Sequence, residues 1–410
     1  MDGAASVLEA FFARQPIFDN RGNALAYELL YRPSPDALSA VGDPAQMSAK
    51  VTVDAMLGMN LSAVTDGLPA FLNATREMLV DGIIDNLNPS GLVIEVLETV
   101  EPDGDVIEAC ARLVGKGHTI ALDDWFENDP RAALLPFASI IKVDVLDRSP
   151  QDAGRLIAPL RNGKLRLLAE RVETAEVHDA CVAAGFEWFQ GYFYRRPEIM
   201  RQADLRPEQL VIVSAMNLVQ DDSVADHRLG AFFKRDPALA YKLVRMANAA
   251  PMGVRQIESV EHAVSIVGRA AIFRWLGLLL AASVGQDGVK RELLRETLVR
   301  ARQCELLAEP ARVRPPGHLF LVGLFSRIES LLGVPLARIV DKVVLPGAVA
   351  AALTSRDGPY AGVLSVTEAY EDALWELIEP LAASAGLAPG QVPATYHEAL
   401  AWALQVGRTL

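Results

Sequence analysis

The first 200 residues contain seven short apolar runs, rich in Val, Ile and Leu, separated by stretches long enough for a helix. They read AYELLYR (26–32), AFLNAT (70–75), LVIEVLE (92–98), TIALDDW (119–125), SIIKVDVL (139–146), LRLLAERVE (165–173) and WFQGYFY (188–194). Nearly continuous apolar runs alternating with helical segments indicate strands covered on both faces, as in a parallel α/β sheet. The sequence contains neither a GxGxxG motif nor a P-loop, which are the usual reasons to prefer an open sheet. The pattern therefore predicts a closed, TIM-like α/β barrel.

Each run carries one or two polar residues within or at the end of its apolar core. The C-terminal ends of parallel barrel strands converge on one rim, so these side chains are expected to face one cavity. They are Glu28, Asn73, Glu95, Asp123, Asp124, Lys142, Asp144, Glu170, Glu173 and Gln190. A single carboxylate at a strand end is more often a helix cap or half of a salt bridge, and we interpret Asp103 and Asp129 in that way. Capping explains the full set poorly, because a cap follows a strand and does not lie inside its apolar run.

The seven carboxylates in this set imply a cation. Carboxylates that lie so close to one another repel and raise each other's pKa. The arrangement is therefore costly without positive charge among them. Oxygen ligands with almost no histidine nearby select hard divalent cations. We therefore expect Mg²⁺ or Mn²⁺ rather than zinc.

The formal net charge of −13 lies entirely in the first half of the chain. Residues 1–200 hold 30 acidic and 17 basic side chains, whereas residues 201–410 hold 22 of each. Without a basic stripe, neither nucleic acid nor a membrane is an expected partner. Three scattered cysteines indicate a reducing compartment, and the longest apolar stretch, 275–284, is about half a membrane span. We expect a cytoplasmic protein.

From Pro207 onward the pattern changes to Leu- and Ala-rich helical periodicity, which predicts an all-α domain. Asp236 and Ser259 are expected N-caps. Further helical segments are expected around 271–284, 291–307, 318–333, 345–354, 363–384 and 395–406. We place the two domains at 1–200 and 201–410. The short polar join at 197–206 leaves little slack, so the domains are expected to pack on each other.

The motifs of residues 10–200 resemble the EAL domain family, the cyclic di-GMP phosphodiesterases. The likeness rests on Gln15-Pro16-Ile17, Glu28-Leu29-Leu30-Tyr31-Arg32 in place of E-A-L-x-R, Asn73 in LNAT, Glu95 in IEVLE, Asp123-Asp124, Lys142 in KVD, Glu170 and Glu173 in AERVE, and Gln190-Gly191 in QGYF. The resemblance implies hydrolysis of cyclic di-GMP to linear pGpG with two divalent cations, Mg²⁺ or Mn²⁺.

The resemblance also implies roles for these residues. It makes Glu28, Asn73, Glu95, Asp123 and Asp124 metal ligands; Glu170, Lys142 and Glu173 catalytic residues; and Gln15, Arg32, Asp144 and Gln190 substrate contacts.

Two departures from the family pattern bear on activity. The family follows the Asp pair with Phe-Gly-Thr/Ser-Gly, whereas this chain has Trp125 to Pro130 without glycine. The glycine of E-G-V-E is Arg171 here, which adds a positive charge near the rim.

Residues 235–250 and 259–268 resemble the HDOD domain, a relative of HD-type phosphohydrolases without the metal-binding residues. Where an HD enzyme has His-Asp, this chain has Ser326-Arg327. The resemblance implies a regulatory or interaction domain that engages an unidentified protein partner. Three hypotheses follow: a regulated cyclic di-GMP phosphodiesterase that is expected to be a homodimer, a catalytically degenerate cyclic di-GMP receptor, and a scaffold that has lost nucleotide binding.

Overall fold

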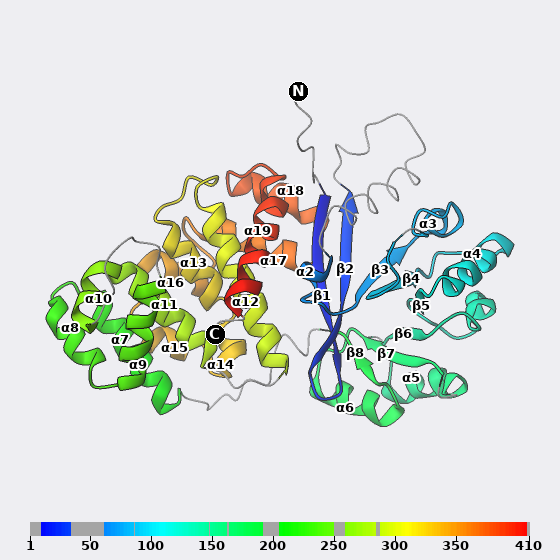
Figure 1. Cartoon of the computed structure of the whole chain (residues 1–410), viewed down its shortest axis with the longest axis horizontal. Helices are drawn as coiled ribbons and strands as arrows, with labels where there is room; N and C mark the ends of the chain where they lie inside the picture. Colours follow the sequence, from blue (N-terminus) through cyan, green and yellow to red (C-terminus); the bar gives the residue numbers. More distant parts are fainter. Residues whose placement is uncertain are drawn as a thin grey trace.

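A barrel and a helical part lie side by side in the computed structural model of the protein (Figure 1). The structure describes residues 10–33, 61–85, 87–146, 148–161, 164–191, 205–249, 259–283 and 288–407. The predicted boundary at 200/201 falls between 191 and 205, outside these ranges, and stays a prediction.

Eight strands close the barrel in chain order. They are β1 (Ala10–Asp19), β2 (Ala24–Pro33), β3 (Ala70–Ala74), β4 (Leu92–Val96), β5 (Thr119–Leu122), β6 (Ile140–Asp144), β7 (Arg166–Glu170) and β8 (Trp188–Phe189). The strands from β2 to β8 pair in parallel with one another, whereas β1 is antiparallel to both β2 and β8. The predicted TIM-like barrel is confirmed.

The expectation of parallel strands throughout is wrong for β1, which the apolar runs had not indicated as a strand. A tight turn joins β1 to β2, and strands joined in this way are antiparallel. In the turn, the Asp19 carboxylate accepts hydrogen bonds of 2.8 Å from the backbone N–H groups of Arg21 and Asn23. Gly22 takes a φ of 77°, a conformation that glycine adopts without strain.

The barrel interior is built in two layers, and strand geometry explains both. Successive side chains point to opposite faces of a strand, so residues two apart share the interior. The apolar layer comprises Ile17, Ala26, Phe71, Val93, Ala121, Ile140 and Leu168, with Trp188 packed against it. Two residues toward the rim from each of these, in the same order, stand Gln15, Glu28, Asn73, Glu95, Asp123, Lys142, Glu170 and Gln190. The polar residues predicted inside the apolar runs therefore form one layer above the apolar layer.

Short helices connect the parallel strands. They are α2 (Leu61–Val64), α3 (Arg76–Val80), α4 (Gly104–Gly115), η2 (Pro130–Leu134), α5 (Pro150–Ile157), η3 (Ala158–Leu160) and α6 (Ala175–Ala184). Asp103 caps α4 by accepting from Val106 N at 3.0 Å, and Asp129 caps η2 by accepting from Arg131 N at 2.8 Å. Both interpretations as caps are confirmed.

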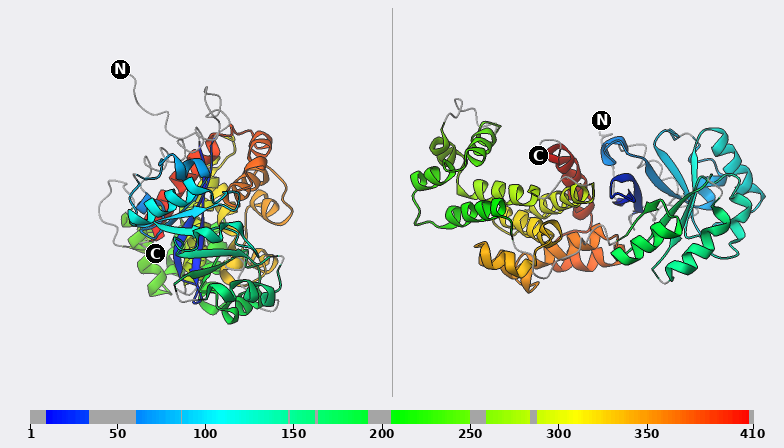
Figure 2. Two further views of the ribbon diagram at one scale, coloured as in Figure 1. Left: turned by 90° about the vertical axis from the view of Figure 1, so that its right-hand side faces the viewer. Right: turned by 90° about the horizontal axis from the view of Figure 1, so that it is seen from below.

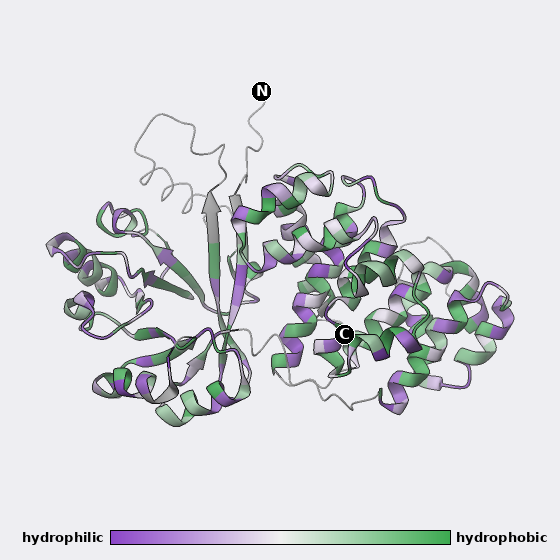
Figure 3. Cartoon of the chain, turned by 180° about the vertical axis from the view of Figure 1, so that it is seen from behind, coloured by the Kyte–Doolittle hydropathy of each residue, from purple (hydrophilic) through white to green (hydrophobic). Residues whose placement is uncertain are grey.

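The regular elements among the described residues after 204 are helices. The helices are α7 (Pro207–Gln220), α8 (Asp226–Phe233), α9 (Pro237–Ala249), α10 (Val260–Val267), α11 (Arg269–Ala282), α12 (Gly288–Leu307), α13 (Pro316–Phe325), α14 (Ile328–Leu332), α15 (Leu336–Lys342), α16 (Gly347–Thr354), α17 (Ala361–Glu371), α18 (Trp375–Ser384) and α19 (Gln391–Gly407). Figure 3 shows green and purple residues interspersed along them, as expected for helices with one buried face. The predicted caps are confirmed, since Asp236 accepts from Leu239 N and Ser259 from His262 N.

Two segments expected as single helices are each divided. The segment 318–333 breaks at Ser326 and Arg327, where Ser326 Oγ turns back to donate to Gly323 O at 2.7 Å. The segment 363–384 breaks between α17 and α18, where Ala373 takes a φ of 54°. Apolar periodicity continues across both breaks, so it could not reveal them. Among the described helices, none alone is long and apolar enough to cross a membrane, and α10 and α11 pass that test only as a pair bent by 108°.

Helix α12 joins the two parts, because it lies beside the β1–β2 hairpin (Figures 1 and 2). Glu292 on α12 accepts a hydrogen bond of 2.7 Å from Tyr27 Oη and lies 3.5 Å from Arg14 Nη2. Arg295, one turn further on, donates to Tyr27 Oη and pairs with Asp66, both at 2.7 Å. The expectation that the domains pack on each other is therefore confirmed.

Candidate active site

The ammonium group of Lys142 lies at the centre of the polar layer. Its Nζ is 3.2 Å from Glu28 Oε2 and 3.1 Å from Asp123 Oδ1. It is 2.8 Å from Glu170 Oε1 and also contacts Glu95. The side chains of Lys142 and Glu95 are 1% and 0% exposed. Four carboxylates from β2, β7, the end of β5 and β4 thus share one buried positive charge.

Three amide side chains, those of Gln15, Asn73 and Gln190, join this cluster. Gln190 Nε2 donates to Gln15 Oε1 and to Glu28 Oε2, both at 2.8 Å. Asn73 Nδ2 reaches Glu28 Oε1 at 3.5 Å. The structure therefore brings together most of the residues that the sequence assigned to one cavity. Gln15, which the family resemblance makes a substrate contact, joins them from the antiparallel strand.

Three buried oxygen atoms of the cluster have no hydrogen-bond donor among the described residues: Glu95 Oε2, Asn73 Oδ1 and Gln190 Oε1. Buried acceptors without a donor are rare and costly, which indicates that a ligand completes the site. Oxygen atoms of Glu28, Glu95 and Glu170 lie within 4.8 Å of one another, a separation that one metal ion can bridge. Hard oxygen donors of this kind fit Mg²⁺ or Mn²⁺.

Burial and mutual repulsion shift the protonation equilibria of the cluster. Burial raises the pKa of Glu170 to about 8, against the attraction of Lys142 and with the help of Asp123 and Glu28. Burial also raises the pKa of Glu95 well above its usual range. Burial disfavours the charged form of Lys142, but the surrounding carboxylates outweigh it and raise its pKa. The site is therefore an acidic cluster that retains a protonated lysine at its centre.

A cavity of about 300 Å³ opens over the cluster. It is lined by Gln15, Pro16, Phe18, Glu28, Glu170, Arg171, Glu173, Gln190 and Gly191. Gly191 has a φ of 150°, and a Cβ added there would lie 2.3 Å from the backbone nitrogen of Val172. Only glycine lets the chain after β8 pass this close to the end of β7, so the position holds Gln190 against Glu28.

The remaining predicted site residues lie at the rim. Asp124 is half-buried with a φ of 42°, and burial followed by repulsion from Asp123 and Asp144 raises its pKa. Asp144 accepts from Arg171 Nη1 at 2.5 Å, while Glu173 is exposed and lines the cavity. Asp124, Asp144 and Glu173 thus stand outside the group that surrounds the lysine. Arg32 belongs to β2, but its side chain lies outside the described part of the chain.

Arg131 supports the cluster through the ends of β4 and β5, and the motifs did not single it out. Its side chain is 0% exposed, and it pairs with Asp129 through Nη2 at 2.6 Å. Nη1 donates to Val96 O at 3.1 Å, and Nη2 also donates to Asp123 O at 2.7 Å. A single arginine thus holds the end of β4 and the backbone of Asp123. An arginine directly after an Asp-Pro cap was the available signal, but its direction is set by the fold.

The Ser326-Arg327 position of the helical part contains a buried ion-pair network. Arg300 pairs with Glu371 and donates to Ser326 Oγ at 3.0 Å. Arg327 reaches Glu371 at 2.8 Å and Glu296 at 3.0 Å. Burial pushes the pKa of Glu371 upward, but the two arginines outweigh it and hold that pKa at about 2.

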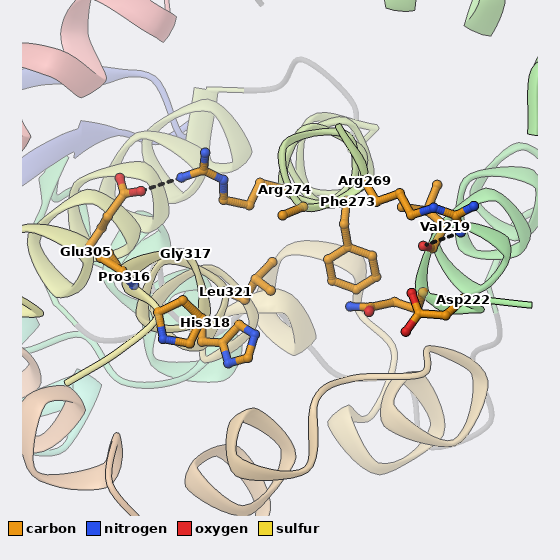
Figure 4. A pocket seen from close by; sticks show the side chains of 13 residues that line it. Val219, Asp222, Arg269, Phe273, Arg274, Glu305, Pro316, Gly317, His318 and Leu321 are labelled. Carbon is orange, nitrogen blue, oxygen red and sulfur yellow. Dashed lines mark hydrogen bonds and ion pairs between the residues drawn. The ribbon is translucent and has the colours of Figure 1, made fainter. Parts of the chain in front are cut away.

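A second cavity, of about 480 Å³, lies in the helical part (Figure 4). Phe273 and Leu321 belong to its apolar wall. Its two arginines are paired within the protein: Arg274 with Glu305 at 2.5 Å and Arg269 with Asp226 at 2.9 Å. The cavity therefore resembles a gap between packed helices more than a site built around a charged ligand.

Residues 207–338 match the family model of the HDOD domain, so the chain carries an HDOD domain after an eight-stranded barrel. The tandem organisation recognised from the sequence is confirmed. The chain is similar to the uncharacterized protein YuxH of Bacillus subtilis, with 29% identity over 403 residues that span 96% of this chain and 98% of the relative. It is also similar to the cyclic di-GMP phosphodiesterase CdgJ of Vibrio cholerae, with 29% identity over 408 residues that span 98% of this chain and 94% of the relative.

Solved structures align with the chain over the barrel. The EAL domain of Mycobacterium smegmatis DcpA has 21% identity and a TM-score of 0.36, over 45% of this chain and 91% of that one.

Proposed function

We propose that the barrel hydrolyses cyclic di-GMP to linear pGpG and that the HDOD domain regulates this activity. The observation that carries the proposal is the cluster of four carboxylates around Lys142, which opens into a cavity and contains buried oxygens without donors. The full-length similarity to CdgJ, which is named as a cyclic di-GMP phosphodiesterase, supports this substrate.

Two divalent cations, Mg²⁺ or Mn²⁺, fit the acidic cluster. Glu28, Asn73, Glu95 and Asp123 would hold one of them, and Asp123 with Asp124 would hold the other. Cations at these residues would neutralise charge on the phosphate and lower the pKa of water. An anionic dinucleotide can approach so acidic a cavity only with such compensation.

The side chains of the cavity have separate tasks in this reaction. Glu170 lines the cavity and lies beside Lys142, so it is placed to take a proton from the attacking water. Lys142 keeps a positive charge in contact with the carboxylates and restrains their orientation. Gln15 and Gln190, bonded to each other at the mouth, are proposed to contact the dinucleotide, with Arg32 on a phosphate. In the net reaction, water adds across one phosphodiester P–O bond.

A second candidate function is a cyclic di-GMP receptor with little or no turnover. The loop after Asp124 favours it, because Phe126, which is exposed, and Asn128 stand where the family pattern has glycines. Asn128 nevertheless takes a φ of 60°, a left-handed conformation that asparagine tolerates. Replacing Phe126 and Asn128 by glycine is therefore expected to raise turnover if this loop limits it.

One assay separates these functions. The full-length protein is incubated with cyclic di-GMP and Mg²⁺ or Mn²⁺, binding is measured by calorimetry, and pGpG is measured by chromatography. Binding with product supports the enzyme, and binding without product supports the receptor. Product that persists in Glu28→Ala would contradict the site. Arg166→Ala, at the far end of β7, is the matched control and should behave as the unmodified protein.

We further propose that the protein is cytoplasmic, forms a homodimer and engages another protein through its HDOD domain. The contact of α12 with Tyr27, the residue before Glu28, supports regulation, because a shift of α12 would move the strand that carries a cluster carboxylate.

A further inference from the structure

Arg171 stands at the mouth of the cavity, directly after Glu170 at the end of β7. Its side chain is 57% exposed, and it lines the same cavity as Glu28, Glu170 and Glu173. Among the described residues of this lining, Arg171 is the one cation. The local charge of the lining is otherwise negative, which is unfavourable for an anionic ligand.

The backbone at this position opposes a side chain. Arg171 has a φ of 55°, in the left-handed region where residues other than glycine are strained. The EAL family pattern has glycine there, which adopts this conformation freely. A strained arginine at the rim suggests a use for its guanidinium, because the fold itself would be better served by glycine.

The guanidinium of Arg171 uses only part of its hydrogen-bonding capacity within the protein. Arg171 Nη1 donates to Asp144 Oδ2 at 2.5 Å, and Asp144 Oδ1 in turn accepts from Leu146 N at 2.9 Å. Since more than half of the arginine side chain is exposed, its other N–H groups stay accessible at the mouth. A planar guanidinium with free N–H groups is suited to bidentate contact with phosphate.

We propose that Arg171 binds a phosphate of the cyclic dinucleotide and that Asp144 positions it. The inference rests on the proposed function, since it names a further contact for the same substrate. It also revises the role expected for Asp144 from substrate contact to positioning residue. The arginine supplies at the rim the positive charge that the rest of the lining lacks.

The test compares Arg171→Gly with the unmodified full-length protein. Cyclic di-GMP binding is measured by calorimetry with Ca²⁺, after chromatography has verified that no pGpG forms. Losing a charge-assisted contact to phosphate should raise the Kd about tenfold or more. The melting temperature should rise, because glycine relieves the positive φ. Mn²⁺ affinity, measured separately by calorimetry, should not fall. Guanosine, which lacks phosphate, should not discriminate between the two proteins.

Two control variants isolate the cause. Arg166→Ala removes a 59% exposed arginine that pairs with Glu187 at the other end of β7, and Kd should not change. Arg312→Gly relieves a comparable φ of 57° in the HDOD domain, and should raise the melting temperature without altering Kd. Arg171→Lys keeps the charge without the fork and should bind with intermediate affinity.

The outcomes are distinguishable. If the unmodified protein does not bind cyclic di-GMP, the proposed function fails and this inference fails with it. If the unmodified protein binds and Arg171→Gly binds equally well, the inference alone is overturned. If Arg171→Gly loses Mn²⁺ affinity as well, Arg171 supports the cluster and is not a phosphate contact.

Discussion

Replacing Arg131 by methionine should destabilise the barrel more than any other single change considered for it. The guanidinium is fully buried and makes a bidentate pair with Asp129, whose side chain is also 0% exposed. The same group donates to the carbonyl oxygens of Val96 and Asp123. Methionine fills much of the volume but provides no donor. The buried carboxylate of Asp129 then loses its cation and the carbonyl group of Asp123 loses its donor, whereas Val96 O keeps the backbone N–H of Asp123 at 3.0 Å.

The magnitude follows from these contacts. Leaving a buried charge without its partner costs about 3–5 kcal/mol. The carbonyl group of Asp123, which loses its donor, adds about 1–3 kcal/mol. The expected loss for Arg131→Met is therefore at least about 4 kcal/mol, which is a large part of the stability of a typical domain. The companion variant Arg131→Met/Asp129→Asn removes the unpaired charge while keeping an oxygen at the cap. It should recover about 2 kcal/mol or more of that loss.

Urea unfolding followed by far-UV circular dichroism measures both variants. If the two substitutions acted independently, the double variant would be less stable than Arg131→Met. Because the buried pair couples them, the double variant must instead be the more stable of the two. A loss below about 1 kcal/mol for Arg131→Met, or a double variant less stable than the single one, would refute the assignment of Arg131 as a buried anchor. Mn²⁺ calorimetry on Arg131→Lys then reports whether the anchor also positions Asp123, because a weaker anchor should lower the affinity of the cluster.

Three further predictions concern other parts of the chain. The pKa of Glu371 is lowered from 4.5 to about 2, so its stabilisation is complete above pH 4.5 and is lost as the pH falls toward 2. The free energy of unfolding, measured with urea between pH 6 and pH 2, should therefore fall by about 3 kcal/mol as the pH is lowered. The fall should be smaller in Glu371→Gln. Tyr27→Phe should cost about 1.5–3 kcal/mol, and a double-mutant cycle with Glu292→Gln should give a coupling energy well above zero. Gly191→Ala should lower the melting temperature and cyclic di-GMP affinity together, whereas Gly104→Ala, where a Cβ meets nothing within 4 Å, should lower neither.

Much of the candidate site followed from the linear pattern, because strand alternation is local. The residues at 28, 95 and 142 lie inside apolar runs, and in a closed barrel the outward face of such a run packs against apolar helices, so charged side chains there are expected to point inward. The apolar runs did not indicate strand β1, because its sequence is interrupted by Arg14 and Gln15. Its antiparallel pairing is decided by the turn that follows. The helical breaks at Ser326 and Ala373 were missed because apolar periodicity does not register a local change of direction.

The sequence by itself determined the two-part organisation and, apart from Gln15 of β1, the composition of the polar layer, since both depend on periodicity and on which residue types share a strand face. Only the tertiary structure decided how these residues meet. It placed Lys142 among four carboxylates, Arg131 against the backbone of Asp123, and Glu292 against Tyr27 across 265 positions of the chain. Such contacts depend on how strands and helices far apart in sequence are oriented in space. No local pattern carries that information, because one side chain can satisfy its charge or hydrogen bonds with many different partners.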